Sequence, residues 1–447
     1  MKNDARNILL FGAGKSATVL ISHLLERSAL CKWTLTVVDA DLSLAQSKIS
    51  AHPNAFALSF NIYNNEERIK VINSADIVIS MLPPSLHFIV AQDCVAFGKN
   101  LLTASYMDEK IKTLQPAINQ RQLLFICEMG LDPGIDHMSA MQMIDNIKGN
   151  GGHIKSFKSH CGGLVAPGSD DNPWHYKITW NPANIVNAGK TGAMYKEKGH
   201  IIKIDYPDVF DQHSRIIIPG LGQYACYPNR DSLSYMSLYE LENTSTFIRT
   251  TLRHPDFCTG WKYIIKAGLT REDAVVPVKH STTQTIAQWF LHCLKTYTEC
   301  ESFTDFFTKY IPDEEKQLVQ QLFNYLGLFS NEMIQDSLPT QASVLQHLLE
   351  TRLKLGSQDK DMIVMLHEID YETEGKEYSS KSSMVIQGKD HLVTAMAKTV
   401  GLPLAIAAEL ILENRISLKG LHIPVIKELY EPVLSKLKDN KIYFREI

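Results

Sequence analysis

The sequence predicts an α/β protein that has a doubly wound parallel sheet at the N-terminus, a second α+β domain with a mixed sheet, and a helical insertion. Three observations support this prediction. Short apolar runs recur about every 20 residues up to position 127, strand-like runs with a different rhythm follow, and helical periodicity fills residues 256–355. Strands that are apolar on both faces need helices on both sides of the sheet, and the spacing leaves room for one crossover helix each time.

The N-terminal apolar runs are the expected strands of the first domain. They are NILLFG at 7–12, TLTVVD at 34–39, AFALSF at 55–60, DIVIS at 76–80, NLLTAS at 100–105 and LLFIC at 123–127. Such runs alternating with amphipathic stretches are typical of repeated strand–helix–strand units. We assign residues 1–130 to this domain and expect the C-terminal helices at 390–447 to pack back on it.

The rest of the chain predicts a mixed-sheet domain over 131–255 and 356–389, with the helical insertion at 256–355 between them. Strand-like runs lie at 153–160, 201–206, 215–218, 362–369 and 377–386. The last two flank a Glu374-Gly375-Lys376 turn, which predicts a hairpin. The apolar stretch at 391–415 is interpreted as two helices, with Gly401 as a C-cap and Pro403 at the start of the second.

Composition excludes several classes of protein. The 447 residues are 45% hydrophobic and 21% charged, with a formal net charge of −4, which excludes a small scaffold, a disordered chain and a strongly basic nucleic-acid binder. No apolar stretch approaches the roughly 20 residues that span a bilayer. The eight cysteines form no C-x-x-C pair and no zinc-like spacing, so we expect reduced thiols, no metal site and a cytoplasmic location.

A glycine-rich turn follows the first expected strand. Gly12 to Ala17 reads G-x-G-x-x-A and opens a helix, the arrangement that binds a dinucleotide pyrophosphate in a Rossmann-type domain. Asp39 ends the second strand, where a carboxylate accepts hydrogen bonds from the ribose hydroxyls and repels a 2′-phosphate, so NAD is favoured over NADP. The alternative is that Asp39 only caps the next helix, a role that Asp41 is also placed to fill.

Three further turns follow later strands of the first domain. They contain Ser80 to Pro84, Thr103 to Tyr106, and Gly130 to His137. Turns at the carboxyl ends of parallel strands form the crevice where ligands bind. Strand termination and helix capping explain the first two about equally well, and the third is either a domain-linking turn or a site.

Taken with SFKSHCGGLVAPGSDDNPWHYKITW at 156–180, the GLDPGIDH turn resembles the glutamate-forming saccharopine dehydrogenases, also called saccharopine reductases. The resemblance covers nearly the whole chain and continues through GAGKSA, SMLPPSLH, TASY, YPNRDS at 227–232, TLR at 251–253, MIVMLHE at 362–368 and AMAKTVGLPLAIAAELIL at 395–412. The sequence departs from the family pattern at Val165, Gly168 and Asp39, where NADP-using members have a phosphate-tolerant end to the strand.

The resemblance implies an NAD(P)-dependent oxidoreductase of lysine metabolism that oxidises saccharopine reversibly to L-glutamate and aminoadipate semialdehyde. Saccharopine carries three carboxylates, which forked guanidinium groups bind best. The cofactor candidates are Gly12, Ala13, Gly14, Lys15, Ser16, Asp39, Ala40, Asn61, Ile62, Ser80, Met81, Leu82, Ala104, Ser105, Leu131, Asp132, Pro133 and Asn181. The substrate candidates are Ser105, Tyr106, Asp132, Cys161, Arg230, Thr251, Leu252 and Arg253.

Removal of hydride from the amine carbon needs a neutral amine, so a base is required. Asp132 is the first candidate, with Lys177 and His160 as rivals, and Cys161 is interpreted as a pocket wall.

Two other functions stay open: a dehydrogenase that reduces an imine made from a polyamine and an aldehyde, and an NAD-binding redox sensor without turnover. An open edge of the second sheet would favour a homodimer.

Overall fold

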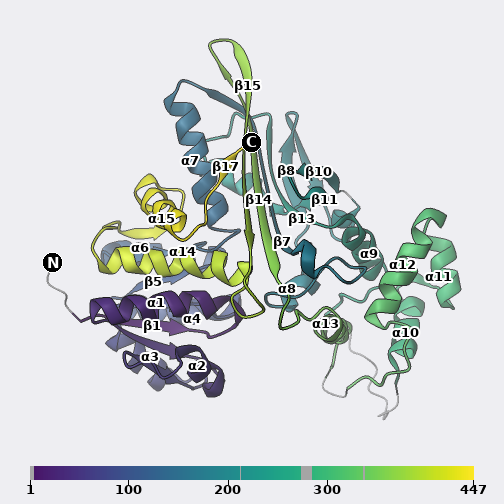
Figure 1. Cartoon of the computed structure of the whole chain (residues 1–447), viewed down its shortest axis with the longest axis horizontal. Coiled ribbons are helices and arrows are strands. Elements are labelled where there is room, and N and C mark those ends of the chain that lie inside the picture. Colours follow the sequence, from purple (N-terminus) through teal and green to yellow (C-terminus); the bar gives the residue numbers. More distant parts are fainter. Residues whose placement is uncertain (1–4, 212, 273–283, 336–337) are drawn as a thin grey trace. The chain divides into compact units, whose positions relative to one another are not determined.

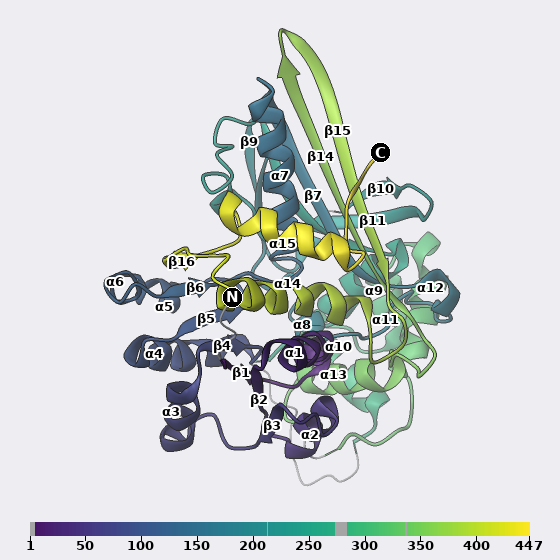
Figure 2. The same ribbon diagram turned by 60° about the vertical axis from the view of Figure 1, so that its left-hand side comes forward.

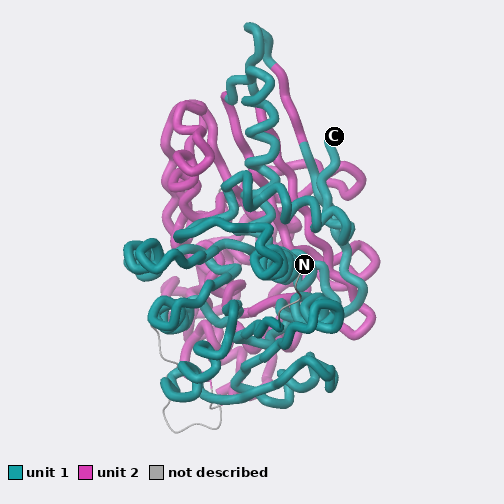
Figure 3. The backbone as a smooth tube through the Cα atoms, turned by 90° about the vertical axis from the view of Figure 1, so that its left-hand side faces the viewer, with its two compact units in different colours: residues 1–154, 371–377, 382–447 teal, residues 155–370, 378–381 magenta. Residues whose placement is uncertain are grey.

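A computed structural model describes residues 5–211, 213–272, 284–335 and 338–447 of the chain (Figure 1). The chain divides into two compact units, coloured separately in Figure 3. The first unit comprises Met1–Ile154, Tyr371–Glu377 and Ser382–Ile447, and the second comprises Lys155–Asp370 and Tyr378–Lys381. Each unit is described by itself below.

The first unit contains the expected parallel sheet. Its seven strands follow the order β16-β6-β5-β4-β1-β2-β3, and all their pairings are parallel. The strands are β1 Asn7–Phe11, β2 Thr34–Val38, β3 Ala55–Leu58, β4 Ile77–Ser80, β5 Asn100–Thr103, β6 Leu124–Ile126 and β16 Gly420–His422. The doubly wound fold class is thus confirmed, and the strand order reverses between β1 and β4, which is where such sheets bind ligands. The short strand β16 has no counterpart in the sequence-based prediction.

Helices connect these strands, and the C-terminal helices belong to the same unit. They are α1 Thr18–Cys31, α2 Leu42–Ile49, α3 Asn65–Ser74, α4 His87–Phe97, α5 Glu109–Lys112, α6 Gln115–Gln120, α7 Ile135–Gly149, α14 Ala395–Leu412 and α15 Lys427–Asp439, with short 3₁₀ turns at Lys15–Ala17 and Pro84–Leu86. Helix α7 packs on α15, and the Tyr430 hydroxyl donates to Asp145. These contacts group α7 with the first unit, which extends to Ile154, beyond the expected limit at 130.

The prediction of two helices around Gly401 and Pro403 is wrong. Residues Ala395–Leu412 form one helix, α14, with Pro403 inside it, and α14 lies beside α1 in both ribbon views (Figures 1 and 2). A Cβ at Gly401 would lie 2.9 Å from the Leu20 backbone nitrogen. The glycine therefore allows two helices to approach closely and does not end one of them.

Helix α14 also corrects the expectation that no stretch is apolar enough to span a membrane. Its 18 residues meet that test by length and composition, with a mean hydropathy of 1.6. However, 83% of this segment is buried inside the protein, as in the core helix of a globular unit. Length and hydropathy are therefore weak evidence of a membrane span here.

The second unit is built on a mixed sheet with the strand order β10-β11-β13-β7-β14-β15. Its strands are β7 His153–Val165, β8 Ala193–Glu197, β9 His200–Ile204, β10 Ser214–Ile218, β11 Gly222–Pro228, β12 Arg230–Asp231, β13 Thr246–Arg253, β14 Asp361–Thr373 and β15 Lys376–Gln387. The expected hairpin is confirmed, because Glu374 and Gly375 join β14 to β15 with φ values of 52° and 75°. Residues 371–377 around the hairpin turn and residues 382–387 of β15 are grouped with the first unit, together with β17 Arg445–Glu446.

The helical insertion shares one hydrophobic core with one face of this sheet. Its helices are α9 Pro255–Lys266, α10 Ile286–Thr298, α11 Phe303–Tyr310, α12 Asp313–Leu326 and α13 Gln341–Arg352, and α8 Ala183–Val186 precedes them. Trp174 is fully buried among Phe257 and Trp261, and its indole N–H donates to the Leu322 carbonyl at 2.9 Å. Residues of β8 and β11 belong to the same cluster, so sheet and helices form one unit. All eight cysteines are free thiols, as expected.

A buried carboxylate joins three helices of the first unit. Glu409 on α14 is 2% exposed and contacts His23 at 3.0 Å and Arg27 at 3.3 Å on α1, and Lys436 at 2.6 Å on α15. Burial opposes its ionisation, but the hydrogen bonds from His23 and Lys436 and the charge of Arg27 outweigh burial and lower the pKa of Glu409 to about 2.

We expect Glu409→Gln to lower the free energy of unfolding at pH 7 by about 1–3 kcal/mol, because the partly buried side chains of His23, Arg27 and Lys436 lose the negative charge that pairs with them. Since the folded-state pKa lies below the ordinary value of 4.5, this contribution is present above pH 4.5 and is lost as the pH falls toward 2. Urea unfolding at pH 7 and pH 3 measures both effects. Glu413→Gln, which removes a more exposed partner of Arg27, is the control and should cost less. Equal losses at both pH values would contradict the assignment.

Candidate functional site

The glycine-rich turn lies at the point where the first sheet reverses its strand order. The Gly12 N–H donates to the Val38 carbonyl of β2 at 2.8 Å, and the Met81 N–H after β4 donates to the Phe11 carbonyl at 2.8 Å. Gly12 has a φ of +98°, and a Cβ there would lie 2.8 Å from the Met81 carbonyl oxygen. Gly12 is therefore required by the fold of the turn itself.

Gly14 has a different environment. It is exposed, its φ of −60° suits any residue, and a Cβ there would meet nothing within 4 Å. The N–H groups of Lys15 and Ser16 open the helical segment and have no acceptor within it. The residues present thus fit a dinucleotide: a Cβ at Gly14 would fill the space above an anion-binding helix start.

Asp39 connects the second strand to this turn. One carboxylate oxygen accepts the Ala13 N–H at 2.7 Å, and the other accepts the Asp41 N–H at 3.0 Å. The cap of α2 is Asp41, which accepts the Leu44 N–H at 3.1 Å. Asp41, and not Asp39, therefore caps this helix. The Asp39 carboxylate lies directly beside the glycine-rich turn.

The remaining first-unit candidates follow the carboxyl ends of successive parallel strands. Asn61 and Ile62 follow β3, Ser80 to Leu82 follow β4, Ala104 to Tyr106 follow β5, and Leu131 to Pro133 follow β6. Because all pairings are parallel, these turns lie on one edge of the sheet, together with the glycine-rich turn and Ala40.

A histidine that sequence reasoning missed joins two of these turns. The His87 ring contacts the Ser80 hydroxyl at 2.8 Å through Nδ1 and the Ser105 hydroxyl at 2.7 Å through Nε2. Burial lowers the pKa of His87 to about 4, so the ring is neutral and both donates and accepts. The only feature of the sequence that could have indicated His87 was its position in the SMLPPSLH motif.

The GLDPG turn carries Asp132 on a rigid backbone. The Gly130 N–H donates to the Pro133 carbonyl at 3.0 Å, and Gly134, with a φ of +143°, has no room for a Cβ because Gly130 lies against it. Below the turn, buried His137 contacts the Glu128 carboxylate at 2.9 Å. Asp132 itself is half-buried at the carboxyl edge of the sheet.

In the second unit, three candidates share one face of the mixed sheet. Thr251 on β13 lies opposite Tyr227 on β11 and opposite Cys161 on β7, and Arg253 follows two residues later on the same face. Cys161 is buried in this row.

Arg253 is a buried cation with an incomplete set of partners. The residue is 6% exposed and its guanidinium lies over the rings of Tyr176 and Phe257, at 5.2 and 5.6 Å from the centroids. Nη1 donates to the carbonyls of Leu252 at 2.8 Å and Gly163 at 3.4 Å, whereas Nε is buried without an acceptor. No carboxylate in the described part of the chain pairs with it, although a buried charge normally has a counterion.

The remaining candidates of the second unit are Leu252, Arg230 and Asn181, and none of their side chains lies beside Arg253 in the same row. The Leu252 side chain is fully buried in the hydrophobic cluster on the opposite face, so its backbone carbonyl is the part that faces Arg253. Arg230 is exposed on the short strand β12 with a φ of 52°. Asn181 is exposed and its side chain accepts the Ala183 N–H at 3.0 Å, before α8.

The two rival bases are both engaged in ion pairs. Lys177 contacts Asp171 at 2.9 Å and Asp359 at 2.7 Å; burial disfavours its charge, but these partners outweigh burial and raise the pKa. His160 lies on the sheet face opposite Cys161 and contacts the Thr250 hydroxyl at 2.7 Å and Glu368 at 3.3 Å. Both arrangements favour the protonated form, which is a poor base.

Comparison with family models matches this chain twice. Residues 8–126 match the model described as the saccharopine dehydrogenase NADP binding domain, and residues 130–442 match the saccharopine dehydrogenase C-terminal domain. Saccharopine dehydrogenase (NADP(+), L-glutamate-forming) of Saccharomyces cerevisiae is 30% identical over 450 residues, which cover 99% of each chain. A solved apo structure of the L-Glu-forming enzyme from that organism superposes with a TM-score of 0.87, covering 99% of this chain and 100% of the other.

Longer relatives match over part of their length. The alpha-aminoadipic semialdehyde synthase of Arabidopsis thaliana is 32% identical over 426 residues, which are 91% of this chain and 40% of the plant protein. The mitochondrial synthase of Bos taurus is 30% identical over 447 residues, or 47% of its own length. The chain thus spans less than half of these synthases.

Proposed function

The chain belongs to the saccharopine dehydrogenase family, and from this membership we propose that it oxidises the CH–NH bond of saccharopine to give L-glutamate and aminoadipate semialdehyde in lysine metabolism, reversibly. The observation that carries the proposal is Arg253, a buried guanidinium without a carboxylate partner in the described residues. A substrate with three carboxylates supplies such a partner. A polyamine brings ammonium groups instead, which a buried guanidinium repels.

The chemistry requires little more of the protein than orientation and proton transfer. A bound nicotinamide would supply the hydride acceptor, and oxidation of the secondary amine gives an imine that water splits into the two products. The chain's own residues must hold the carboxylates, exclude other anions and take the amine proton.

Asp132 is the base in this proposal. Lys177 and His160 are held as cations by neighbouring carboxylates, whereas Asp132 lies on a rigid turn at the ligand-binding edge of the sheet. Asp132→Asn should lose turnover while keeping affinity for the nicotinamide cofactor. Retained turnover in this variant would mean that another group, or water, removes the amine proton.

The direct test is to incubate the purified full chain with saccharopine and NAD or NADP and to follow absorbance of the reduced cofactor. Turnover with release of L-glutamate supports the proposal. Turnover in the reverse assay with a polyamine and an aldehyde, but not with saccharopine, would support the polyamine enzyme. Cofactor binding without either turnover would support a redox sensor.

We propose NAD as the preferred cofactor, although the matching family model is described as NADP binding and the Saccharomyces cerevisiae relative carries NADP in its name. The support is Asp39, whose carboxylate lies beside the glycine-rich turn and would repel a 2′-phosphate. Asp39→Ser combined with Ala40→Arg should shift the ratio of kcat/KM values toward NADP by about tenfold or more, the effect of about 1.4 kcal/mol of altered charge interaction. Ala40→Arg alone, which keeps the carboxylate, is the matched control. A wild-type preference for NADP would overturn the assignment.

We further propose a homodimer and a cytoplasmic location. Strand β10 is the last strand at one edge of the second sheet's order, and Ile217 on it is 72% exposed, so this edge is suited to pair with a second copy. The eight free thiols agree with a reducing compartment. Light scattering of the purified chain and fractionation of the native cells test the two statements, and a monomer or an oxidising compartment would refute them.

A further inference from the structure

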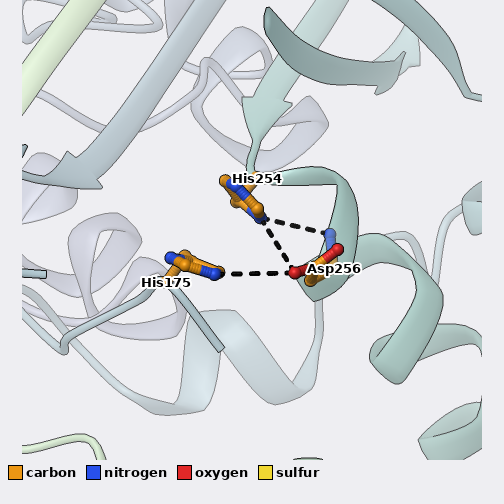
Figure 4. A group of neighbouring side chains, drawn as sticks. All are labelled: His175, His254 and Asp256. Atoms are coloured by element: carbon orange, nitrogen blue, oxygen red, sulfur yellow. Dashed lines mark hydrogen bonds and ion pairs between the residues drawn. The ribbon is translucent and has the colours of Figure 1, made fainter. Parts of the chain in front are cut away.

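Two histidines and an aspartate converge in the second unit, outside the groups assigned above (Figure 4). The His175 Nε2 atom lies 3.5 Å from an Asp256 carboxylate oxygen, and the His254 Nδ1 atom lies 3.7 Å from the same oxygen. All three ligand atoms lie within 4.8 Å of one another. The three side chains are each about one third exposed, so an ion from solvent can reach them.

The backbone holds these side chains in place. His175 lies between Trp174 and Tyr176, both of which are buried in the hydrophobic core of this unit. His254 and Asp256 lie at the start of α9, directly before the buried Phe257. Because His175 and Asp256 each adjoin a buried aromatic residue and His254 follows the buried Arg253, the donors meet without the folding of a flexible segment, which lowers the entropic cost of binding an ion.

A fourth residue orients one of the ligands. The Nδ1 atom of His175 contacts the Asp170 carboxylate at 2.6 Å, which fixes the orientation of the ring and directs Nε2 toward Asp256. A carboxylate behind a ligating histidine is the usual outer partner in zinc sites. Asp170 and Asp256 together also balance the two positive charges of a divalent ion.

The two separations from Asp256 suit a small tetrahedral ion. Zinc binds histidine and carboxylate donors at about 2.0–2.2 Å, which places neighbouring donors roughly 3.3–3.6 Å apart. The observed separations of 3.5 and 3.7 Å to Asp256 are close to these values. One competing interaction is weak: the Asp256 N–H donates to the His254 Nδ1 atom at 3.3 Å, beyond the usual range for such bonds.

We propose that His175, His254 and Asp256 bind one divalent transition-metal ion, of the zinc class, with Asp170 as a positioning residue. Two imidazoles and one carboxylate are donors that zinc prefers over calcium or magnesium. Three protein ligands leave a fourth position for water. The ion joins the segment before Tyr176 to the start of α9, and this proposal does not depend on the dehydrogenase activity proposed above. Sequence spacing gave no sign of it, because the ligands come from separated segments.

The test uses the full chain, stripped of metal by a chelator and titrated with Zn²⁺ against a chromophoric zinc indicator. We expect one tight equivalent in the wild type. Asp170→Asn should weaken binding by about 10–100-fold, the usual effect of losing an outer partner. His175→Asn and Asp256→Asn should weaken it further. His200→Gln, which changes an exposed histidine of the same unit outside the cluster, should bind as the wild type does.

A second readout separates binding from folding. Saturating Zn²⁺ should raise the Tm of the wild type and of His200→Gln, but not that of His175→Asn, whose asparagine tolerates the φ of 48° at this position. Should the metal-free variant melt below the metal-free wild type, Asp170→Asn supplies the comparison instead. Equal Zn²⁺ affinity in the wild type, His175→Asn and Asp170→Asn would overturn the proposal.

Discussion

Gly14→Val is expected to abolish NAD binding while the protein keeps a cooperative thermal transition at the wild-type Tm. A Cβ at Gly14 meets no protein atom within 4 Å and the backbone is compatible with any residue, so the folded chain accommodates the valine. The added methyl groups occupy the space that a pyrophosphate needs above the helix start. A hydrogen bond to a charged group contributes about 1.5–3 kcal/mol, so the loss of even one phosphate contact at this helix start should lower the affinity for NAD by about ten- to hundredfold.

Gly12→Val provides the contrasting variant in the same turn. A Cβ at Gly12 would lie 2.8 Å from the Met81 carbonyl oxygen, and the φ of +98° is strained for valine. This variant should lose stability as well as affinity. Calorimetric titration with NAD and a thermal melt of each variant distinguish the two roles. Wild-type NAD affinity in Gly14→Val would show that the dinucleotide does not approach this turn.

The sequence predicted the first sheet well because local signals there agree with the tertiary structure. Strands β1 to β6 are short apolar runs between amphipathic stretches, and burial on both faces demands that pattern. The edge strand β16 has three residues and depends on pairing with β6, a contact between distant segments that no local pattern encodes. The predicted helix break at Gly401 was wrong for a related reason. This glycine is explained by its close contact with Leu20 on another helix, which no local pattern shows.

The candidate site was predictable to the extent that it lies in contiguous motifs. The glycine-rich turn and Asp39 were predicted from spacing, and the structure adds that the Asp39 carboxylate accepts the Ala13 N–H. Arg253 was selected by its motif, yet its burial and its free Nε depend on Tyr176 and on the neighbouring strands. The engagement of Lys177 by Asp359 is likewise a contact over 182 positions, which only the folded chain reveals.

Arg253→Ala is expected to lower kcat/KM for saccharopine by about ten- to hundredfold or more. An unpaired carboxylate in a closed site leaves a desolvation cost of about 1–3 kcal/mol uncompensated, and each 1.4 kcal/mol corresponds to a factor of ten. The guanidinium has a buried Nε without an acceptor, so it has hydrogen-bonding capacity to offer to a substrate carboxylate. The measurement is the initial rate of cofactor reduction against saccharopine concentration, with cofactor affinity measured separately.

Matched variants separate charge from packing, because the Arg253 side chain also lies over Tyr176 and Phe257. Arg253→Met keeps a long side chain over these rings without the charge, and should lose as much activity as Arg253→Ala while restoring most of the stability. Arg253→Lys keeps the charge but not the fork, and should recover only part of kcat/KM. Arg415→Met removes an exposed arginine of the first unit that is not a candidate site residue and should change neither quantity. A fall in cofactor affinity equal to the fall in kcat/KM, or an Arg253→Met variant as active as the wild type, would mean that Arg253 stabilises the sheet and does not bind a carboxylate.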